Sequence, residues 1–490
     1  MVNRVREGPA PRSGLGSAAG RVLAPVVAAV AAGSVWLGAG ASAGWPGFRG
    51  PAGNGLAAES SVPVRWSRTE GVRWAARVPG RGWSSPVVWN SRVYLTSALT
   101  SRPFKQPSPG LYGNDYIAQL RAQGLPDDEV LRRVRARDTE GPEESDVVRY
   151  MVYALDAATG RIVWEQEAHR GLPSGGRHRK NTYASETPAT DGERLYVSFG
   201  QNVGLFCFTL DGALVWKRQW PPTPIYLDFG TASSPVVHGG RVYLQQDSES
   251  ASFLTALDAR TGTDIWRTAR PYDGFLKSSW STPAVWSTQA GTEIVTTGHG
   301  MIRSYGLDGS ELWRITIPGV TMATPSPLVW NGHLYAGTGA QNGEASRPFF
   351  AIRQGGRGDI TPADDQEDHP FVLWRQPRAS GYTPSAVVAD GRVYLVHDTG
   401  IMGVYDAGTG RPLYKARVGG VGHTFSASPV AAGRHVYFLD EEGTTVVIEG
   451  GDSYKQVALN PLDEMALASP AVADGSLFIR TETMLYRIGP

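Results

Sequence analysis

Residues 154–164, Ala-Leu-Asp-Ala-Ala-Thr-Gly-Arg-Ile-Val-Trp, contain the pattern that decides the fold of this chain. Apolar residues alternate with other residues on both sides of the Asp-to-Gly segment, which is typical of two half-buried strands joined by a tight turn. Asp156 can bond backbone amides across the turn, and Gly160 supplies the positive φ that such a turn often needs. The string therefore predicts a β-hairpin whose second strand ends in a large aromatic residue, Trp164.

This hairpin recurs along the chain. Its string returns at residues 256–266 and, with substitutions, at residues 404–414. Shortened copies end at Trp216 and Trp313. One hairpin repeated along a chain indicates a repeat fold, in which each unit adds its own slice of core.

A second string precedes the hairpin: Ser or Thr, then Pro (Ala386 in one copy), two or three apolar residues, a turn, and an apolar-aromatic strand. Its copies begin at Ser85, Thr187, Ser234, Thr282, Ser326, Ser385, Ser428 and Ser469. Apart from two longer steps, successive copies lie 41 to 48 residues apart, which fits a propeller blade of four antiparallel strands, typically ~40–50 residues. We interpret the repeated Ser, Tyr and Trp positions as core and turn residues.

The two ends of the chain complement each other. The eighth copy is followed by a third strand near residues 485–488, whereas residues 72–78, with Trp74, form an isolated fourth strand. We therefore predict an all-β protein, an eight-bladed β-propeller of four-stranded antiparallel blades over residues 72–490, whose N-terminal strand completes the last blade and closes the ring. Closure leaves only short, protected strand edges.

Two insertions account for the longer steps. Residues 99–148 interrupt the first blade, and the composition of residues 114–123 and 126–136 predicts a small helical insertion, either a lid or an ornament. Residues 340–370 interrupt the fifth blade with a polar, Gly-rich and acidic loop. Its acidic residues do not have the spacing of an EF-hand loop; they include Asp364, Asp365 and Asp368.

Composition excludes several classes of function. The 490 residues carry a net charge of +1, so no global field favours nucleic acid or an anionic membrane surface. Cys207 is the single cysteine, which excludes an intramolecular disulfide and any multi-Cys metal site. We expect Cys207 to be a buried strand residue and the protein to be a monomer.

The N-terminus has the pattern of a secretory signal peptide. Four arginines within residues 4–21 precede an apolar run from Val22 to about Ala41, and Ala41-Ser42-Ala43 matches a small-residue cleavage site. We expect cleavage near Ala43, a lead-in over residues 44–71, and export to the periplasm or beyond, with no transmembrane span in the mature chain. An uncleaved anchor is the alternative.

The string Ala-x-Asp-x-x-Thr-Gly-x-x-x-Trp is the tryptophan-docking motif of the PQQ-like β-propeller family, which this chain resembles from about Trp45 to Pro490. Residues 45–55, Trp-Pro-Gly-Phe-Arg-Gly-Pro-Ala-Gly-Asn-Gly, also resemble the lead-in of exported bacterial PQQ-like repeat proteins. Eight blades occur in quinoprotein alcohol dehydrogenases and in the propeller lipoprotein of the outer-membrane barrel-assembly machinery. The resemblance implies a structural docking role for Trp74, Asp156, Gly160, Trp164, Trp216, Asp258, Gly262, Trp266 and Trp313.

A quinoprotein dehydrogenase would need PQQ on the propeller axis, a calcium ion held by carboxylate and amide ligands, and an Asp base. Members of that family often cover the quinone with adjacent cysteines, and Cys207 has no such partner. Glu186 and Asn181 have the residue types of a quinoprotein calcium site. The sequence holds no haem attachment string, Cys-x-x-Cys-His.

The residues that precede the first strand of each blade are the best candidates for a ligand site, because they ring one mouth of the axial channel. A mixture of aromatic, polar and charged side chains there suits a small polar ligand or a peptide. The candidates are Trp83, Asn181, Tyr183, Glu186, Asp228, Lys277, Trp280, Tyr382 and His423. The basic loop at residues 177–183 is either a contact for an anionic ligand or a solvated loop.

Function sits in sites added to a fold, so the sequence supports more than one hypothesis. The favoured one is an exported, non-catalytic scaffold, without cofactor or metal, that binds an unidentified protein, peptide or glycan at the channel mouth. The first alternative is a PQQ- and calcium-dependent oxidoreductase acting on an alcohol or sugar. The second is a role in outer-membrane protein assembly.

Overall fold

The computed structural model describes residues 44–59, 61–103, 114–143, 146–200, 202–274, 276–298, 300–319, 322–339, 347–363, 366 and 369–490. The predicted signal peptide lies outside these residues, as do Asp364, Asp365 and Asp368. In the described part of the chain, none of the helices is both long and apolar enough to cross a membrane.

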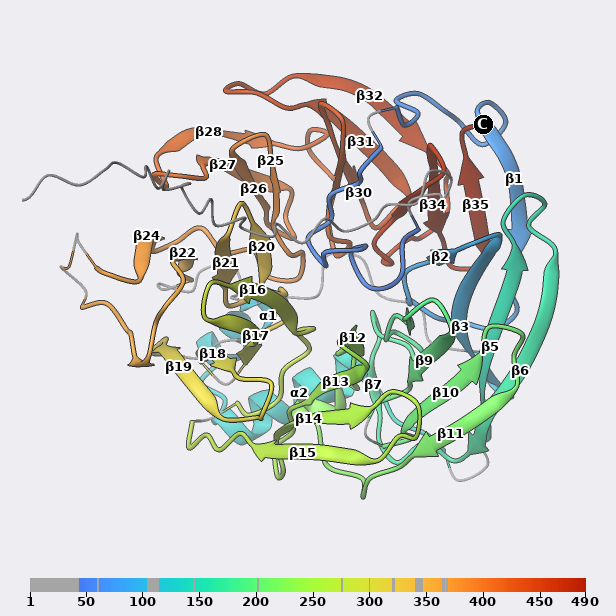
Figure 1. The fold of residues 1–490 in the computed structure, drawn as a ribbon, viewed down its shortest axis with the longest axis horizontal. Helices are drawn as coiled ribbons and strands as arrows, with labels where there is room; N and C mark the ends of the chain where they lie inside the picture. Colours follow the sequence, from blue (N-terminus) through green and yellow to red (C-terminus); the bar gives the residue numbers. More distant parts are fainter. Residues whose placement is uncertain are drawn as a thin grey trace, which may run out of the picture. The chain divides into compact units, whose positions relative to one another are not determined.

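Eight antiparallel sheets confirm the predicted eight-bladed β-propeller (Figure 1). Blades 1 to 4 consist of β2 (Val87–Trp89), β3 (Arg92–Thr100), β5 (Val148–Asp156) and β6 (Ile162–Gly171); β8 (Ala189–Thr190), β9 (Arg194–Ser198), β10 (Leu205–Thr209) and β11 (Leu214–Arg218); β12 (Val236–His238), β13 (Arg241–Gln246), β14 (Phe253–Asp258) and β15 (Asp264–Ala269); and β16 (Ala284–Thr288), β17 (Gly291–Gly298), β18 (Met301–Tyr305) and β19 (Glu311–Thr316).

Blades 5 to 8 consist of β20 (Leu328–Trp330), β21 (His333–Gly337), β22 (Phe349–Ile352) and β24 (Val372–Gln376); β25 (Val387–Ala389), β26 (Arg392–Val396), β27 (Ile401–Asp406) and β28 (Pro412–Arg417); β29 (Val430–Ala432), β30 (His435–Leu439), β31 (Thr444–Glu449) and β32 (Gln456–Pro461); and β33 (Ala471–Ala473), β34 (Ser476–Arg480), β35 (Met484–Ile488) and β1 (Val72–Arg77). Strand β1 pairs antiparallel with β35 (Figure 1). The N-terminal strand therefore supplies the fourth strand of the last blade.

The Asp-x-x-Thr-Gly turns have the geometry that their residues predict. Asp156 Oδ1 accepts bonds from the backbone N–H of Thr159 at 2.9 Å and from its hydroxyl at 2.8 Å. Gly160 has a φ of +73°, and a Cβ atom added there would lie 2.7 Å from the indole of Trp74. The glycine is thus required twice: for the left-handed backbone conformation, and to let the tryptophan of the preceding blade pack on the turn.

Five of the docked tryptophans also donate the indole N–H to a carbonyl in a turn of the next blade. These bonds are Trp74 to Ala157 (2.9 Å), Trp164 to Leu210 (3.0 Å), Trp216 to Ala259 (3.1 Å), Trp266 to Leu307 (2.7 Å) and Trp374 to Ala407 (2.8 Å). Trp313 instead donates to Glu293 within its own blade, at 2.9 Å. The predicted insertion at residues 340–370 contains β22 (Phe349–Ile352), which is a strand of blade 5. The part that follows β22 replaces the turn that would receive Trp313, and its segment β23 (Gly358–Asp359) pairs in parallel with β19.

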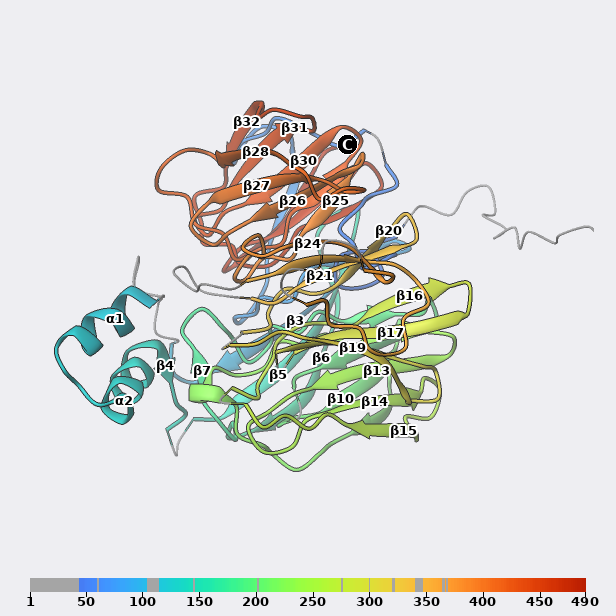
Figure 2. The ribbon, with the colours of Figure 1, turned by 90° about the vertical axis from the view of Figure 1, so that its left-hand side faces the viewer.

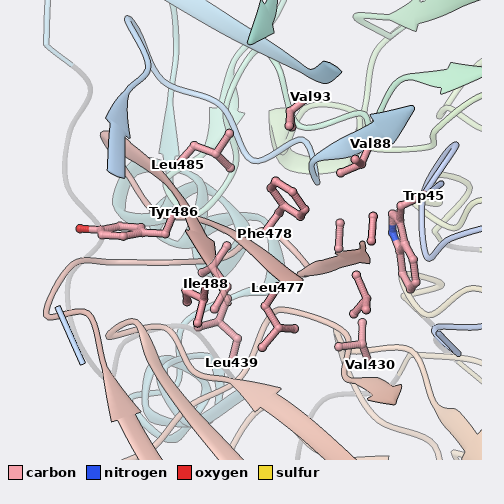
Figure 3. Close-up of a cluster of buried hydrophobic side chains, with 14 of the residues drawn as sticks. Trp45, Val88, Val93, Val430, Leu439, Leu477, Phe478, Leu485, Tyr486 and Ile488 are labelled. Carbon is pink, nitrogen blue, oxygen red and sulfur yellow. The ribbon is translucent and has the colours of Figure 1, made fainter. Parts of the chain in front are cut away.

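The largest apolar cluster joins the last blade to both of its neighbours (Figure 3). Val88 and Val93 come from blade 1, Val430 and Leu439 from blade 7, and Phe478 from blade 8. Burial of apolar surface contributes roughly 25 cal/mol per Å², so this cluster holds the joint between the first and last blades. Elsewhere in the core, burial raises the pKa of Cys207 to about 12, as expected for an unreactive strand residue.

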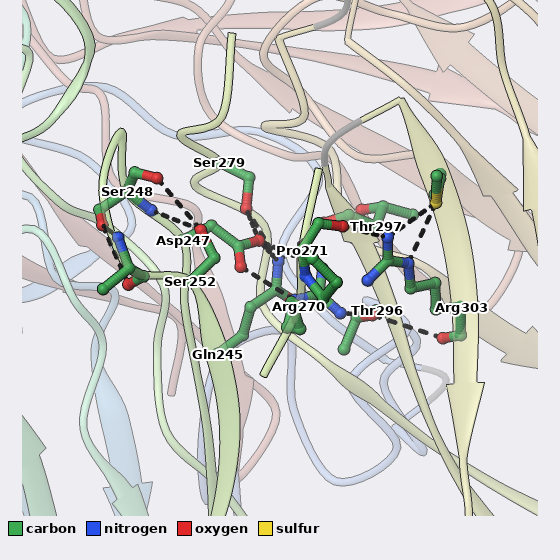
Figure 4. Close-up of polar contacts among 12 residues, drawn as sticks. Gln245, Asp247, Ser248, Ser252, Arg270, Pro271, Ser279, Thr296, Thr297 and Arg303 are labelled. Atoms are coloured by element: carbon green, nitrogen blue, oxygen red, sulfur yellow. Dashed lines mark hydrogen bonds and ion pairs between the residues drawn. The ribbon is translucent and has the colours of Figure 1, made fainter. Parts of the chain in front are cut away.

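A buried polar network crosses from blade 3 to blade 4 (Figure 4). Arg270 Nε lies 2.9 Å from Asp247 Oδ1, and both side chains are fully buried. Gln245 also donates to Asp247, at 2.7 Å, and Arg270 donates to Thr296 at 2.6 Å and to Tyr305 at 2.9 Å. Burial lowers the pKa of Arg270, but Asp247 and Tyr305 more than offset this and raise it, so Arg270 remains charged.

The lead-in crosses the ring. Its contacts are Trp45 with Val88 (blade 1), the carbonyl of Pro46 with the N–H of Thr190 at 2.8 Å (blade 2), Asn54 Nδ2 with the carbonyl of Val329 at 3.1 Å (blade 5), Arg49 with the carbonyl of Ala386 (blade 6) and Leu56 with Ala431 (blade 7). Because these blades lie on opposite sides of the ring and Trp45, Arg49 and Asn54 are buried, we infer that residues 45–57 close one end of the axial channel.

The helical insertion forms two short helices, as predicted: α1 (Asn114–Ala122) and α2 (Asp127–Asp138), followed by β4 (Thr139–Glu140), which pairs with β7 (Arg177–His178). Three acidic residues begin α2, and two arginines lie in its last turn, which complements the helix dipole. Thr139 donates to the carbonyl of Leu227, at 2.8 Å, in the 3-10 turn η1 (Tyr226–Asp228). Figure 2 shows both helices to one side of the blade strands.

Candidate functional site: the axial cavity

A cavity of about 610 Å³ lies on the propeller axis, within the ~300–1,000 Å³ typical of small-molecule sites. Residues from all eight blades line it, together with Phe48 of the lead-in and the inner face of α2. Because Phe48 belongs to the segment that closes one end of the channel, the cavity has a floor at that end. Its mouth is formed by the segments that precede the first strand of each blade.

Eight hydroxyl groups encircle the cavity. They are the side chains that begin the repeated Ser/Thr-Pro string, and we call them the hydroxyl ring: Ser85, Thr187, Ser234, Thr282, Ser326, Ser385, Ser428 and Ser469. In seven successive steps, from Ser85 to Ser469, the hydroxyl oxygen of one blade accepts the backbone N–H of the equivalent residue in the preceding blade, at 2.9–3.0 Å. The repeated hydroxyls therefore join blade to blade as well as lining the lumen.

Aromatic side chains form the wall between the hydroxyl ring and the mouth. Trp83 precedes blade 1, Trp280 precedes blade 4, and Tyr382 precedes blade 6. The indole of Trp280 is held by a 2.7 Å bond to the carbonyl of Gly230 and packs at a tilted angle on Phe229. These three aromatic side chains line the cavity from different sides of the channel.

The charged side chains that line the cavity all have partners. Three are basic and four are acidic. The pairs are Arg121 with Asp127 (3.1 Å), Arg137 with Asp138, and Lys180 with Glu441 (2.7 Å), and Asp398 lies against the imidazole of His397. His178 also lines the cavity, and burial together with nearby cations lowers its pKa to about 3, so it is neutral. Every basic group of the lining is therefore paired with an acid, and the lining holds one more acid than it holds bases.

The structure brings together part of the predicted candidate set. Trp83, Asn181, Trp280 and Tyr382 line the axial cavity. Two others line a neighbouring cavity of about 310 Å³ between the loops of blades 1 to 3; they are Tyr183 and Asp228. The phenol of Tyr183 donates to the carbonyl of Gly175, and Asp228 pairs with Arg135 of α2.

Three candidates do not line either cavity. The backbone N–H of Lys277 bonds to Glu249, His423 pairs with the buried Asp440, and Glu186 is buried beneath the mouth, where the hydroxyl of Thr231 donates to it. The position of a residue in the repeat predicts which loops form the mouth, but it does not predict which side chains of those loops point into the cavity.

Glu186 has its pKa raised to about 7 by burial, whereas in the unfolded chain it titrates near 4.5. Between these pH values the unfolded state ionises and the folded state does not, so stability falls as pH rises from about 4.5 to about 7. Between pH 4.5 and pH 8, we expect the free energy of unfolding of the Glu186→Gln variant to fall by ~3 kcal/mol less than that of the wild type. Urea unfolding at the two pH values measures this difference. Glu193→Gln, at an exposed position in the same blade, is the control. The assignment is wrong if both variants follow the wild-type profile.

Several site residues escaped sequence reasoning. The basic loop at residues 177–183 sends Lys180 to the acidic Glu441 of blade 7, and Arg177 to a buried pair with Glu140. An opposite charge some 260 residues away along the chain leaves no local signal. The hydroxyl ring did have a signal, namely the eight-fold Ser/Thr-Pro repeat, which we interpreted as structural alone.

The fold and its axial cavity define a PQQ-like eight-bladed β-propeller, and comparisons with known proteins agree. A family model described as Outer membrane protein assembly factor BamB matches residues 148–269, 250–355 and 371–471. Because these matches cover more than half of the 490 residues, the chain belongs to this family.

Among curated proteins, the serine/threonine-protein kinase AfsK of Streptomyces griseus is 33% identical over 131 residues, which are 24% of this chain and 15% of the kinase. The chain thus spans a small part of that relative's length.

Two solved structures show the same fold. The quinohemoprotein alcohol dehydrogenase of Comamonas testosteroni has a TM-score of 0.58 and 12% identity, over 91% of this chain and 81% of that one. BamB from Moraxella catarrhalis has a TM-score of 0.50 and 13% identity, over 72% of this chain and 94% of that one. At these identities the likeness concerns the fold alone.

The described residues do not fit a PQQ–calcium group. Among them, no group of three His, Cys, Asp or Glu side chains is placed to hold a metal ion. Asn181 Oδ1 already accepts the N–H of Thr182 at 2.8 Å and the hydroxyl of Ser185. Glu186 is not in the cavity lining and accepts the hydroxyl of Thr231. PQQ is a tricarboxylate, whereas the basic groups that line the cavity, Arg121, Arg137 and Lys180, are already paired with acids.

Proposed function

We propose that this protein is an exported β-propeller that binds a ligand in its axial cavity and performs no catalysis of its own. The observation that carries the proposal is the chemistry of the cavity. It combines a closed floor, a ring of hydroxyls and an aromatic wall, which together recognise a guest by shape and hydrogen bonding.

The same observation opposes a catalytic role. General acid–base catalysis needs a titratable group free to exchange a proton with the substrate. The carboxylates of the cavity are engaged in ion pairs or against an imidazole, and His178 is held neutral. Each of these groups therefore already has a partner within the protein.

Calorimetric titration of PQQ with calcium into the purified protein separates this proposal from the oxidoreductase alternative. We expect no binding heat at micromolar protein, because the lumen lacks both a calcium site and spare cations. The intrinsic tryptophan fluorescence, to which Trp83 and Trp280 contribute, is expected to stay unchanged in the same titration. Micromolar binding that is lost in Glu186→Ala would overturn the proposal and favour a quinone-dependent dehydrogenase.

Membership of the family described as Outer membrane protein assembly factor BamB favours a second candidate function, a role in outer-membrane protein assembly. In that case the partner is a protein. Depletion of this protein in the producing cell would then lower the levels of outer-membrane barrel proteins. Unchanged levels would remove this candidate without affecting the cavity-binding proposal.

A further inference from the structure

We propose that the axial cavity binds a neutral saccharide, and this inference rests on the proposed function of the cavity as a ligand site. Three features of the cavity carry it: the donors of the hydroxyl ring, the aromatic wall, and the pairing of every basic side chain of the lining with an acid. Each feature restricts the chemistry of the guest in a different way.

The hydroxyl ring presents donors to the guest. In a hydroxyl group the oxygen accepts and the single hydrogen donates. Seven of the eight oxygens already accept a backbone N–H at 2.9–3.0 Å, and these bonds fix their positions. The hydrogens are then available to oxygen atoms in the lumen. A guest that has many acceptor oxygens around one ring of atoms satisfies several of these donors together.

The aromatic wall selects guests with flat apolar faces. Trp83, Trp280 and Tyr382 approach the lumen from blades 1, 4 and 6. Aromatic side chains provide a large apolar contact with little loss of conformational entropy. A pyranose ring has the matching shape, because its C–H groups form flat faces and its hydroxyls lie around the edge. Its faces pack on the aromatic rings while its edge reaches the hydroxyl ring.

Charge compensation selects a neutral guest over an acidic one. The lining has three basic and four acidic side chains, and Lys180 spans the mouth to reach Glu441 at 2.7 Å. A uronic acid or a sulfated sugar would have to break such a pair to gain a cation, which costs more than the new contact returns when the remaining acid is partly buried. The structure therefore favours neutral hexoses and their oligomers.

The closed floor adds a prediction about which part of a chain binds. Residues 45–57 cross the channel on the far side of the hydroxyl ring from the mouth, and Phe48 lines the floor. A polysaccharide cannot pass through. The cavity, at about 610 Å³, receives one end of an oligosaccharide chain, so a chain blocked at both ends is expected to bind poorly.

The test is the binding of purified full-length protein to an array of neutral, uronic and sulfated oligosaccharides, followed by calorimetry with the best neutral probe. Trp83→Ala and Tyr382→Ala are each expected to weaken that binding about tenfold. Trp330→Ala removes an aromatic residue outside the cavity and is expected to leave binding unchanged. Circular dichroism melting shows whether each variant is folded, and the second variant keeps the test valid if the first is not.

The outcomes are distinguishable. Neutral-sugar binding that depends on Trp83 or Tyr382 supports the inference. Preferential binding of acidic sugars overturns it, as does the absence of sugar binding while a peptide library shows binding that depends on the same two residues. In that last case the cavity is still a ligand site and the proposed function stands. Binding of PQQ with calcium would overturn both.

Discussion

Replacing Gly262 by alanine is expected to destabilise the propeller far more than the same change at Gly391. Both glycines lie in turns with almost equal backbone angles, φ of +70° and +73°. An added Cβ at Gly262 would lie 2.6 Å from the indole of Trp216, whereas at Gly391 nothing lies within 4 Å. The left-handed conformation costs each variant ~1–2 kcal/mol. Gly262→Ala must also displace Trp216 and weaken its 3.1 Å bond to Ala259, which we expect to add ~2–4 kcal/mol.

Thermal melting of the two variants beside the wild type measures this difference. The comparison isolates tryptophan docking, because the backbone strain is common to both variants. If Gly262→Ala and Gly391→Ala melt at the same temperature, the packing of one blade's tryptophan on the next blade's turn does not contribute to stability in the way the geometry indicates.

Neutralising Asp247 is the second large effect that we expect. Asp247→Asn would leave the Arg270 guanidinium fully buried without its anionic partner (Figure 4). Removal of one member of a buried ion pair typically costs ~3–5 kcal/mol. The matched control is Asp264→Asn in the same blade, because Asp264 pairs with Arg218 at 2.7 Å on the surface, where such a pair is worth ~0–1 kcal/mol.

Urea unfolding at pH 7 and at low and high salt distinguishes the two pairs. Salt screens the surface pair and hardly affects the buried one, so only the Asp264→Asn difference is expected to shrink as salt rises. Equal losses for the two variants would show that Arg270 relaxes to another acceptor or to water, and that the network holds blades 3 and 4 together less firmly than its burial indicates.

The fold was predictable because its determinants are local and repeated. The turn from Asp156 to Gly160 carries its own hydrogen bonds and backbone angle, and its copies establish the period. Ring closure was also predictable, since a three-strand eighth unit and an isolated strand with Trp74 complete each other. What the pattern did not show was the second role of the repeated Ser and Thr residues: their hydrogen bonds run between blades, and no single repeat contains both partners.

The site was less predictable for a related reason. The mouth loops have no shared motif, so their side-chain directions depend on contacts from distant blades. Trp280 turns inward because Gly230 accepts its indole N–H, whereas His423 turns toward Asp440 instead. The floor of the cavity could not be predicted from the sequence. Residues 45–57 resemble a family lead-in, but their position depends on contacts with five different blades.

The pairing of β1 with β35 has a consequence for how the molecule folds. Partners such as Trp74 and Arg487 are separated by more than 400 residues, ten times the length of a blade. The entropy of loop closure grows by only ~0.6 kcal/mol per doubling of the loop, so this joint costs about 2 kcal/mol more than one inside a blade. The pairing also slows folding, because contacts between distant residues form slowly. Seven blades can assemble as they are synthesised. Strand β1 stays unpaired until β35 has been synthesised, and the pairing of these two strands then closes the ring.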